Sequence, residues 1–142
     1  MLILLDTNIL SLLQRQVQPA TGQILARLQM APKHERWTTV ITFQEQTRGW
    51  LAAIHRARND DQLLWAYRSL SEMLDKFRNL NVFSFDETAM AIFNNLKTQK
   101  LGVGTHDLRI ASIALARGAK VITQNVRDFE RVPGLLVEDW TV

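Results

Sequence analysis

The chain contains no cysteine among its 142 residues, which excludes disulfide bonds, thiolate metal sites and thiol nucleophiles. No apolar run approaches the roughly 20 residues that a membrane-spanning helix needs. The N-terminus also lacks the basic region and long apolar stretch of a secretory signal. We therefore expect a cytoplasmic protein that has no contact with a membrane.

The composition is that of one ordinary globular domain, with 46% hydrophobic and 22% charged residues. There is no internal repeat, low-complexity segment or linker, so residues 1–142 are predicted to form a single domain. The formal net charge of +3 modestly favours a polyanionic partner, although many unrelated proteins share this balance.

Short apolar segments alternate with helical patterns along the chain. Residues 2–5 form a continuous apolar run, as expected for a strand buried on both faces of a parallel sheet. Further strands are predicted at residues 37–41, 81–85 and 119–123, with a short fifth strand at 135–137. The fold class predicted is therefore α/β, with a central parallel sheet of four to five strands flanked by helices on both faces.

Capping residues mark where the intervening helices begin and end. Asn8 is predicted to cap a helix that begins at Ile9, and Thr42 to open the helix after the second strand. A break near Asn59 divides the long helical region that follows, and Gly118 ends a later helix as a left-handed cap.

Four carboxylates are predicted to meet at one edge of this sheet, where open α/β sheets bind ligands beyond the carboxyl ends of their strands. Asp6 follows the first strand, Glu45 lies one turn into the helix after the second, and Asp128 follows the fourth. Asp107 opens a helix whose N-terminus faces the same edge.

Such a cluster requires raised pKa values or a cation, because two like charges about 4 Å apart repel by about 4 kcal/mol near a protein surface. Ligands that are all oxygen suit a hard ion, Mg²⁺ or Mn²⁺. A bound ion of this kind can generate hydroxide and stabilise charge on phosphorus oxygens. The cluster therefore predicts phosphodiester hydrolysis.

Each acid also has a structural interpretation. Glu45 fits a capping box with Thr42, which is the favoured reading for this residue alone, and Asp107 suits the dipole of its helix. Asp128 lies in a polar loop, whereas Asp6 is the acid least easily explained by helix chemistry. Asp86 also follows a strand but is assigned as a helix cap and left out of the site.

Four segments of the sequence resemble the motifs of the PIN-domain family, especially the VapC-like toxins of bacterial toxin–antitoxin pairs. They are residues 4–10 (LLDTNIL), 44–49 (QEQTRG), 107–112 (DLRIAS) and 123–129 (TQNVRDF), followed by VPGL at 132–135 and EDW at 138–140. The resemblance covers almost the whole chain and rests on the order and spacing of the motifs.

The resemblance implies a single PIN-like domain with metal-dependent endoribonuclease activity, in which metal-bound water attacks the phosphorus. The implied ligands of one or two Mg²⁺ or Mn²⁺ ions are Asp6, Glu45, Asp107 and Asp128. The implied supporting residues, for which turn chemistry is an equal alternative, are Thr7, Thr123 and Asn125.

The family also implies an RNA substrate, a homodimer and an antitoxin that occupies the groove near the site. Possible contacts to phosphates or to acidic antitoxin groups, with a solvated surface charge as the alternative, are Arg48, Arg109 and Arg127. An apolar stripe at helical spacing over residues 63–77 is a candidate partner surface, although core packing is the favoured reading.

Other functions are less well supported by the residues. A PIN-like binding module without nuclease activity stays open but leaves the four acids unexplained, and DNA stays open as a substrate. A phosphatase with Asp6 as nucleophile lacks the second aspartate two residues later. No P-loop or nucleophile elbow is present, and no histidine spacing indicates a zinc site.

Overall fold

All 142 residues are described by the computed structural model, which forms one α/β unit around a five-stranded sheet. The strands are β1 (Ile3–Leu5), β2 (Arg36–Thr39), β3 (Asn81–Phe83), β4 (Lys120–Ile122) and β5 (Val137–Glu138). They lie in the order β3-β2-β1-β4-β5 and every neighbouring pair is parallel. The predicted parallel α/β sheet is confirmed.

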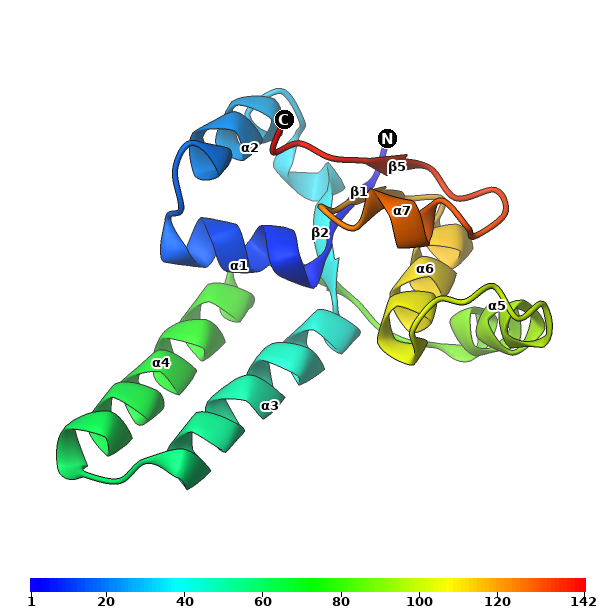
Figure 1. Cartoon of the computed structure of the whole chain (residues 1–142). Coiled ribbons are helices and arrows are strands. Elements are labelled where there is room, and N and C mark those ends of the chain that lie inside the picture. The colour runs from blue at the N-terminus through cyan, green and yellow to red at the C-terminus, as the bar shows by residue number, and fades with distance from the viewer.

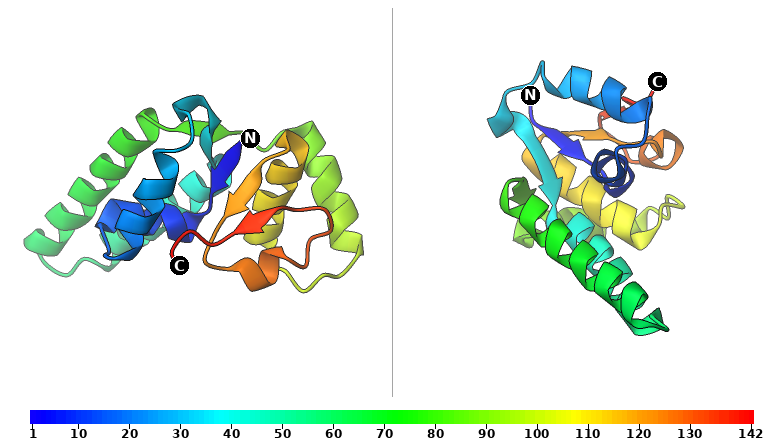
Figure 2. Two further views of the ribbon diagram at one scale, coloured as in Figure 1. Left: turned by 90° about the horizontal axis from the view of Figure 1, so that it is seen from above. Right: turned by 90° about the vertical axis from the view of Figure 1, so that its left-hand side faces the viewer.

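Seven α-helices connect and cover the strands (Figure 1). They are α1 (Thr7–Arg15), α2 (Ala20–Leu28), α3 (Val40–Arg56), α4 (Asp60–Arg78), α5 (Glu87–Thr98), α6 (Thr105–Arg117) and α7 (Val126–Phe129), with a short 3₁₀ turn at Lys33–Glu35. Helices α1 and α2 lie on one face of the sheet and α5 and α6 on the other, while the α3–α4 hairpin extends away from it (Figure 2). No helix is long and apolar enough to cross a membrane.

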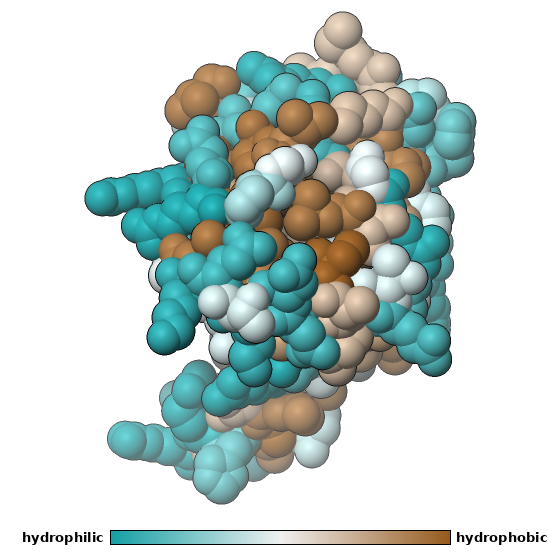
Figure 3. All heavy atoms as spheres, turned by 90° about the vertical axis from the view of Figure 1, so that its right-hand side faces the viewer, coloured by the Kyte–Doolittle hydropathy of each residue, from teal (hydrophilic) through white to brown (hydrophobic).

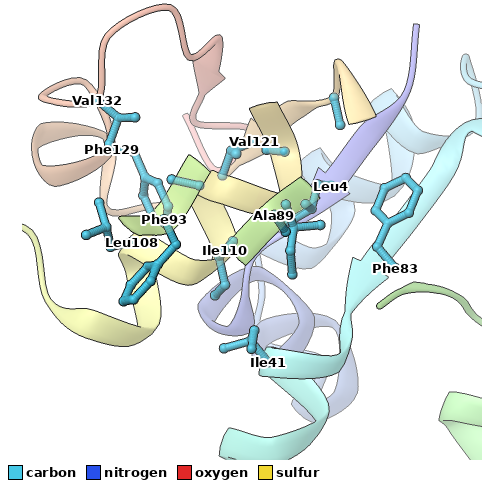
Figure 4. Close-up of a cluster of buried hydrophobic side chains, with 14 of the residues drawn as sticks. Leu4, Ile41, Phe83, Ala89, Phe93, Leu108, Ile110, Val121, Phe129 and Val132 are labelled. Carbon is cyan, nitrogen blue, oxygen red and sulfur yellow. The ribbon is translucent and has the colours of Figure 1, made fainter. Parts of the chain in front are cut away.

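The alternation of side chains along β1 divides the core into two layers. Leu4 faces the larger cluster, where α5, α6 and α7 contribute Phe93, Ile110 and Phe129 (Figure 4). Its neighbours Ile3 and Leu5 face α1 and α2 on the opposite side. Because both faces are covered, every residue of β1 is buried, as the continuous apolar run predicted.

The α3–α4 hairpin packs on α1 through a third, smaller cluster of Leu10, Met73 and Phe77. The apolar stripe predicted on residues 63–77 therefore divides between core and surface. Phe77 is buried, whereas Leu64 and Tyr67 are more than half exposed. On the α5 side of the molecule, apolar atoms gather in a central area surrounded by hydrophilic ones (Figure 3).

Two predicted helix starts were wrong, and both errors bear on the site. Helix α1 begins at Thr7 and its cap is Asp6, because the chain turns directly at the end of β1. Helix α3 begins at Val40 and its cap is Thr39, whose hydroxyl accepts a hydrogen bond from the Thr42 amide at 3.1 Å. Strand β2 is correspondingly shorter than predicted.

The caps predicted at Asp86 and Gly118 are confirmed, and the predicted break near Asn59 coincides with a cap. The side chains of Asn59 and Asp86 cap α4 and α5, and Gly118 ends α6 with a positive φ of 64°. The last strand lies at Val137–Glu138, two residues beyond the start expected at residue 135.

Candidate active site

The acidic side chains meet where the strand order changes direction. From β1 the chain proceeds outward through β2 to β3, and then returns to β4 on the other side of β1. Crossovers that diverge in this way leave a crevice at the carboxyl ends of the central strands. Asp6 and Thr123 directly follow β1 and β4, and the N-terminus of α6 brings Asp107 to the same edge.

Asp6 is the most buried of the acids, with 3% of its surface exposed. One carboxylate oxygen accepts from the Thr7 amide at 2.8 Å, and the other accepts from the Thr123 hydroxyl at 2.8 Å. The pKa of Asp6 is raised to about 6, chiefly by burial; the two hydrogen bonds lower it, and the charges of Asp107 and Glu45 add to the increase. Asp6 is therefore a cap and also a carboxylate whose ionised form lacks a compensating charge.

Glu45 lies in the second turn of α3, because the helix begins at Val40. It is too far into the helix to form the predicted capping box, so that interpretation was wrong. Its Oε1 atom is buried and has no hydrogen-bond partner, and the Nδ1 atom of the His106 imidazole lies 3.6 Å away. Burial raises the pKa of Glu45, the Thr7 hydroxyl partly offsets this, and the charge of Asp107 adds to the increase.

Asn125 joins the other two acids. Its amide Nδ2 donates to Asp107 at 3.1 Å and to Asp128 at 3.0 Å. Burial raises the pKa of Asp107; the Asn125 hydrogen bond lowers it, the Asp128 charge raises it and His106 lowers it. Asp128 lies on the short helix α7 rather than in the loop that was expected, and Arg131 is 3.7 Å from its Oδ1 atom.

Thr123 organises the end of β4. It is fully buried, and its hydroxyl donates to the Asp6 carboxylate while accepting from the backbone amide of Asn125 at 2.9 Å. The Asn8 side chain lies 3.4 Å from the same hydroxyl and accepts from the Gln124 amide at 3.2 Å. Two of the predicted supporting residues therefore hold the acids by hydrogen bonds, and Thr7 lies between Asp6 and Glu45 in the same network.

The donor set fits a hard divalent cation. Three carboxyl groups have raised pKa values because they are buried close to one another, and the Glu45 Oε1 atom lacks any partner. No three acidic or histidine side chains converge tightly enough to enclose an ion by themselves. Mg²⁺ is commonly held by one or two carboxylates and keeps several of its waters. Such an ion would be held by Asp6, Glu45 and Asp107, with Asp128 joined to Asp107 through Asn125.

None of the three arginines predicted as phosphate contacts forms an ion pair with the acidic side chains of the site. Arg48 and Arg127 are exposed and make no ion pair, and the Arg109 guanidinium lies over the Phe93 ring at 5.4 Å. His106, for which no role was predicted, is half-buried beside Glu45. Its position next to Asp107 in the first turn of a helix was the signal available in the sequence.

Comparisons with known proteins indicate the same kind of protein as the sequence motifs. The PIN domain family matches residues 3–135. Ribonuclease VapC1 of Haemophilus influenzae (strain R2866) is 30% identical over 145 residues, covering 99% of each chain. The tRNA(fMet)-specific endonuclease VapC of Salmonella typhimurium is 36% identical over 77 residues, covering 51% of this chain and 58% of that protein.

Solved structures give the same answer for the fold. The structure of VapBC-1 from nontypeable Haemophilus influenzae matches with a TM-score of 0.79 at 28% identity, and the match covers 100% of both chains. The structure of DNA-bound VapBC from Salmonella typhimurium matches with a TM-score of 0.77 at 27% identity over 99% of both chains.

Proposed function

Because the chain belongs to the PIN domain family, we propose that it is a metal-dependent endoribonuclease and the toxin of a toxin–antitoxin pair. Relatives named as ribonuclease and tRNA-specific endonuclease support hydrolysis of RNA phosphodiester bonds. The observation that carries the chemistry is the group formed by buried Asp6 and half-buried Glu45 and Asp107, whose pKa values are raised and in which one oxygen of Glu45 has no partner. We assign this activity to a single PIN domain over residues 1–142 that acts in the cytoplasm.

The proposed metal ligands are Asp6, Glu45, Asp107 and Asp128. A bound Mg²⁺ or Mn²⁺ ion would supply positive charge for the phosphate oxygens and lower the pKa of a coordinated water. Thr123 would fix the orientation of Asp6, and Asn125 would hold Asp107 and Asp128 in register. Thr7, which contacts the Asp6 carboxylate through its amide, would complete this support.

The proposed partners are an antitoxin and a second copy of the chain. Solved VapBC structures that match along the whole chain support the antitoxin. Exposed apolar side chains on the hairpin, Leu51, Leu64 and Tyr67 among them, support an interface with another protein surface. Arg48 and Arg127, which are exposed and without an ion pair, remain candidates for phosphate contacts.

The test is cleavage of RNA by the purified protein with Mg²⁺ or Mn²⁺, followed by removal of the metal with EDTA. We expect cleavage only with metal, and Asp6→Asn to reduce the rate by at least about 100-fold, as losses of key electrostatic groups do. Asparagine is as good a helix cap as aspartate, so α1 should stay intact. A matched single-stranded DNA tests whether the substrate is limited to RNA.

The matched control is Asp86→Asn. Asp86 also follows a strand and caps a helix, but it lies outside the acidic cluster and its only ionic partner is Arg117 at 3.5 Å. This variant should cleave RNA like the wild type. Full activity in EDTA, or equal activity of Asp6→Asn, would overturn the proposed mechanism.

A further inference from the structure

A groove leads away from the acidic site between α1 and the α3–α4 hairpin. It encloses about 700 Å³, and Thr7 and Glu45 line its inner end. At its outer part it reaches Trp65 and Arg56. Gly49 also lines the groove, and a Cβ atom at this position would meet nothing within 4 Å, so the wall is open here.

Polar and charged residues outnumber hydrophobic ones along the groove, although apolar atoms make up most of its exposed lining. Only four of its 15 lining residues are hydrophobic. Amide side chains join α1 to α3, since Gln46 Nε2 donates to Gln14 at 2.9 Å and to the Ser11 hydroxyl at 3.3 Å. These hydrogen bonds fix the position of α1 against α3 on this side of the groove.

Two tryptophans form the apolar part of the groove. Trp50 on α3 and Trp65 on α4 meet edge to face, with ring centroids 5.4 Å apart and an interplanar angle of 79°. The contact restrains the Trp65 ring, yet 55% of this residue is exposed. A restrained and exposed indole face is the kind of surface on which an unpaired base stacks.

Three cations line the same groove. Arg15, Arg56 and Lys76 are exposed, and none has a carboxylate within 4.0 Å. Away from the catalytic end the only acid among the lining residues is Glu72. The outer groove therefore carries a positive charge that complements a phosphate backbone.

We propose that this groove binds single-stranded RNA, with one base stacked on Trp65 and the backbone phosphates contacted by Arg56 and Lys76. The proposal rests on the proposed ribonuclease function and names the path by which the strand reaches Glu45. A single strand is required because the bases of an A-form duplex are stacked on one another and cannot reach a tryptophan face. The unpaired cations and the exposed indole favour a nucleic-acid strand as the occupant, because they complement phosphates and bases.

The first test measures binding without cleavage. A fluorescently labelled single-stranded oligoribonucleotide is titrated with the protein in EDTA, and its anisotropy is followed. Trp65→Ala should raise Kd by about five- to 100-fold, as expected for loss of one stacked base. Trp65→Phe keeps a stacking ring and should restore most of the affinity.

The matched control is Tyr67→Ala. Tyr67 lies on the same helix with 53% of its surface exposed, but it does not line the groove. Its removal should leave Kd unchanged. With metal present, Trp65→Ala should raise KM for the same oligoribonucleotide while kcat stays within about twofold, because Trp65 is not part of the acidic cluster.

The second test addresses the phosphates. Arg56→Gln should make the slope of log Kd against log salt concentration shallower by about 0.7, the value for one phosphate contact on a single strand. Arg58→Gln is the control, since Arg58 is also exposed and unpaired but lies outside the groove. Gly49→Leu, which adds bulk to the open wall, should raise Kd as well.

The outcomes separate this proposal from the proposed function. Wild-type cleavage of RNA together with an unchanged Kd in Trp65→Ala and Gly49→Leu would refute the groove and leave the ribonuclease intact. The groove proposal would also be refuted if those variants lost only antitoxin binding or dimerisation and kept their affinity for RNA. No cleavage of any RNA by the wild type, combined with the predicted losses of binding, would refute the nuclease and leave an RNA-binding groove.

Discussion

At the scale of single residues, Asp6 performs two tasks that oppose each other. As the cap of α1 it satisfies the Thr7 amide, and this stabilises the helix. As a carboxylate with 3% exposure beside two other acids, it destabilises the fold when it is ionised, since burial and repulsion raise its pKa to about 6. A bound cation would compensate the charge of ionised Asp6. The destabilisation is therefore what we expect of a metal site from which the ion has been removed.

The stability of the metal-free protein should therefore depend on pH through Asp6. A carboxyl with a raised pKa contributes stability that is fully present below its usual value of 3.8 and is lost as the pH rises through about 6. The loss corresponds to roughly 3 kcal/mol. Urea unfolding in EDTA, measured from about pH 4 to pH 7 for wild type and Asp6→Asn, tests this expectation.

The difference in the free energy of unfolding between wild type and Asp6→Asn isolates the contribution of Asp6. Asparagine keeps the cap and does not titrate, so Asp6→Asn should gain stability relative to the wild type as the pH rises. Glu138, whose pKa is lowered chiefly by a hydrogen bond from Lys120, acts in the opposite direction but equally in both proteins. A constant difference between wild type and variant across this range would contradict the raised pKa.

At the scale of the elements, the start of α3 decides what Glu45 can do. With Thr39 as the cap, Glu45 lies in the second turn and faces Asp6 and Asp107. With Thr42 as the cap it would lie in the first turn, where it could bond back to the chain. Three residues of difference in a helix start therefore separate a structural glutamate from a candidate metal ligand.

Removing this cap should affect both stability and activity. Thr39→Ala should cost about 1 kcal/mol and lower RNA cleavage several-fold, because the first turn of α3 loses the 3.1 Å bond that anchors it. Thr39→Ser should restore both. Asn59→Ala removes the equivalent cap of α4, at the far end of the hairpin, and should cost a similar amount without loss of cleavage. Equal effects of both alanines on cleavage would count against the role of α3 in placing Glu45.

The sequence predicted the elements better than their ends. Apolar runs and helical spacing are repeated signals, so the parallel sheet of an α/β fold and the break near Asn59 could be inferred. A cap depends on which hydroxyl or carboxylate the turning chain brings to a free amide, and Thr39 and Thr42 are equally suitable by type. His106 was missed for a related reason, since its partner Glu45 is remote in sequence.

At the scale of the whole molecule, the acidic site joins segments that are far apart in the sequence. Asp6 ends β1, Glu45 belongs to the hairpin, and Asp107 and Asp128 come from α6 and α7. The two core layers meet at the sheet but do not themselves bring these carboxylates into contact. An ion shared among them would therefore tie the hairpin to both halves of the sheet.

Divalent metal should consequently raise the thermal stability of the whole domain. An ion that binds only the folded state at about 100 times its Kd adds about 2.7 kcal/mol to the free energy of unfolding. For a domain of this size that corresponds to an increase in Tm of several degrees. We expect Mn²⁺ or Mg²⁺ to produce this increase in the wild type and in Asp86→Asn, and little of it in Asp6→Asn, relative to KCl at equal ionic strength. An equal increase in Tm in all three proteins would show that the ion binds outside the acidic site. Asp6 lies at the centre of that site, where it contacts both Thr7 and Thr123, so its loss should weaken any ion bound there.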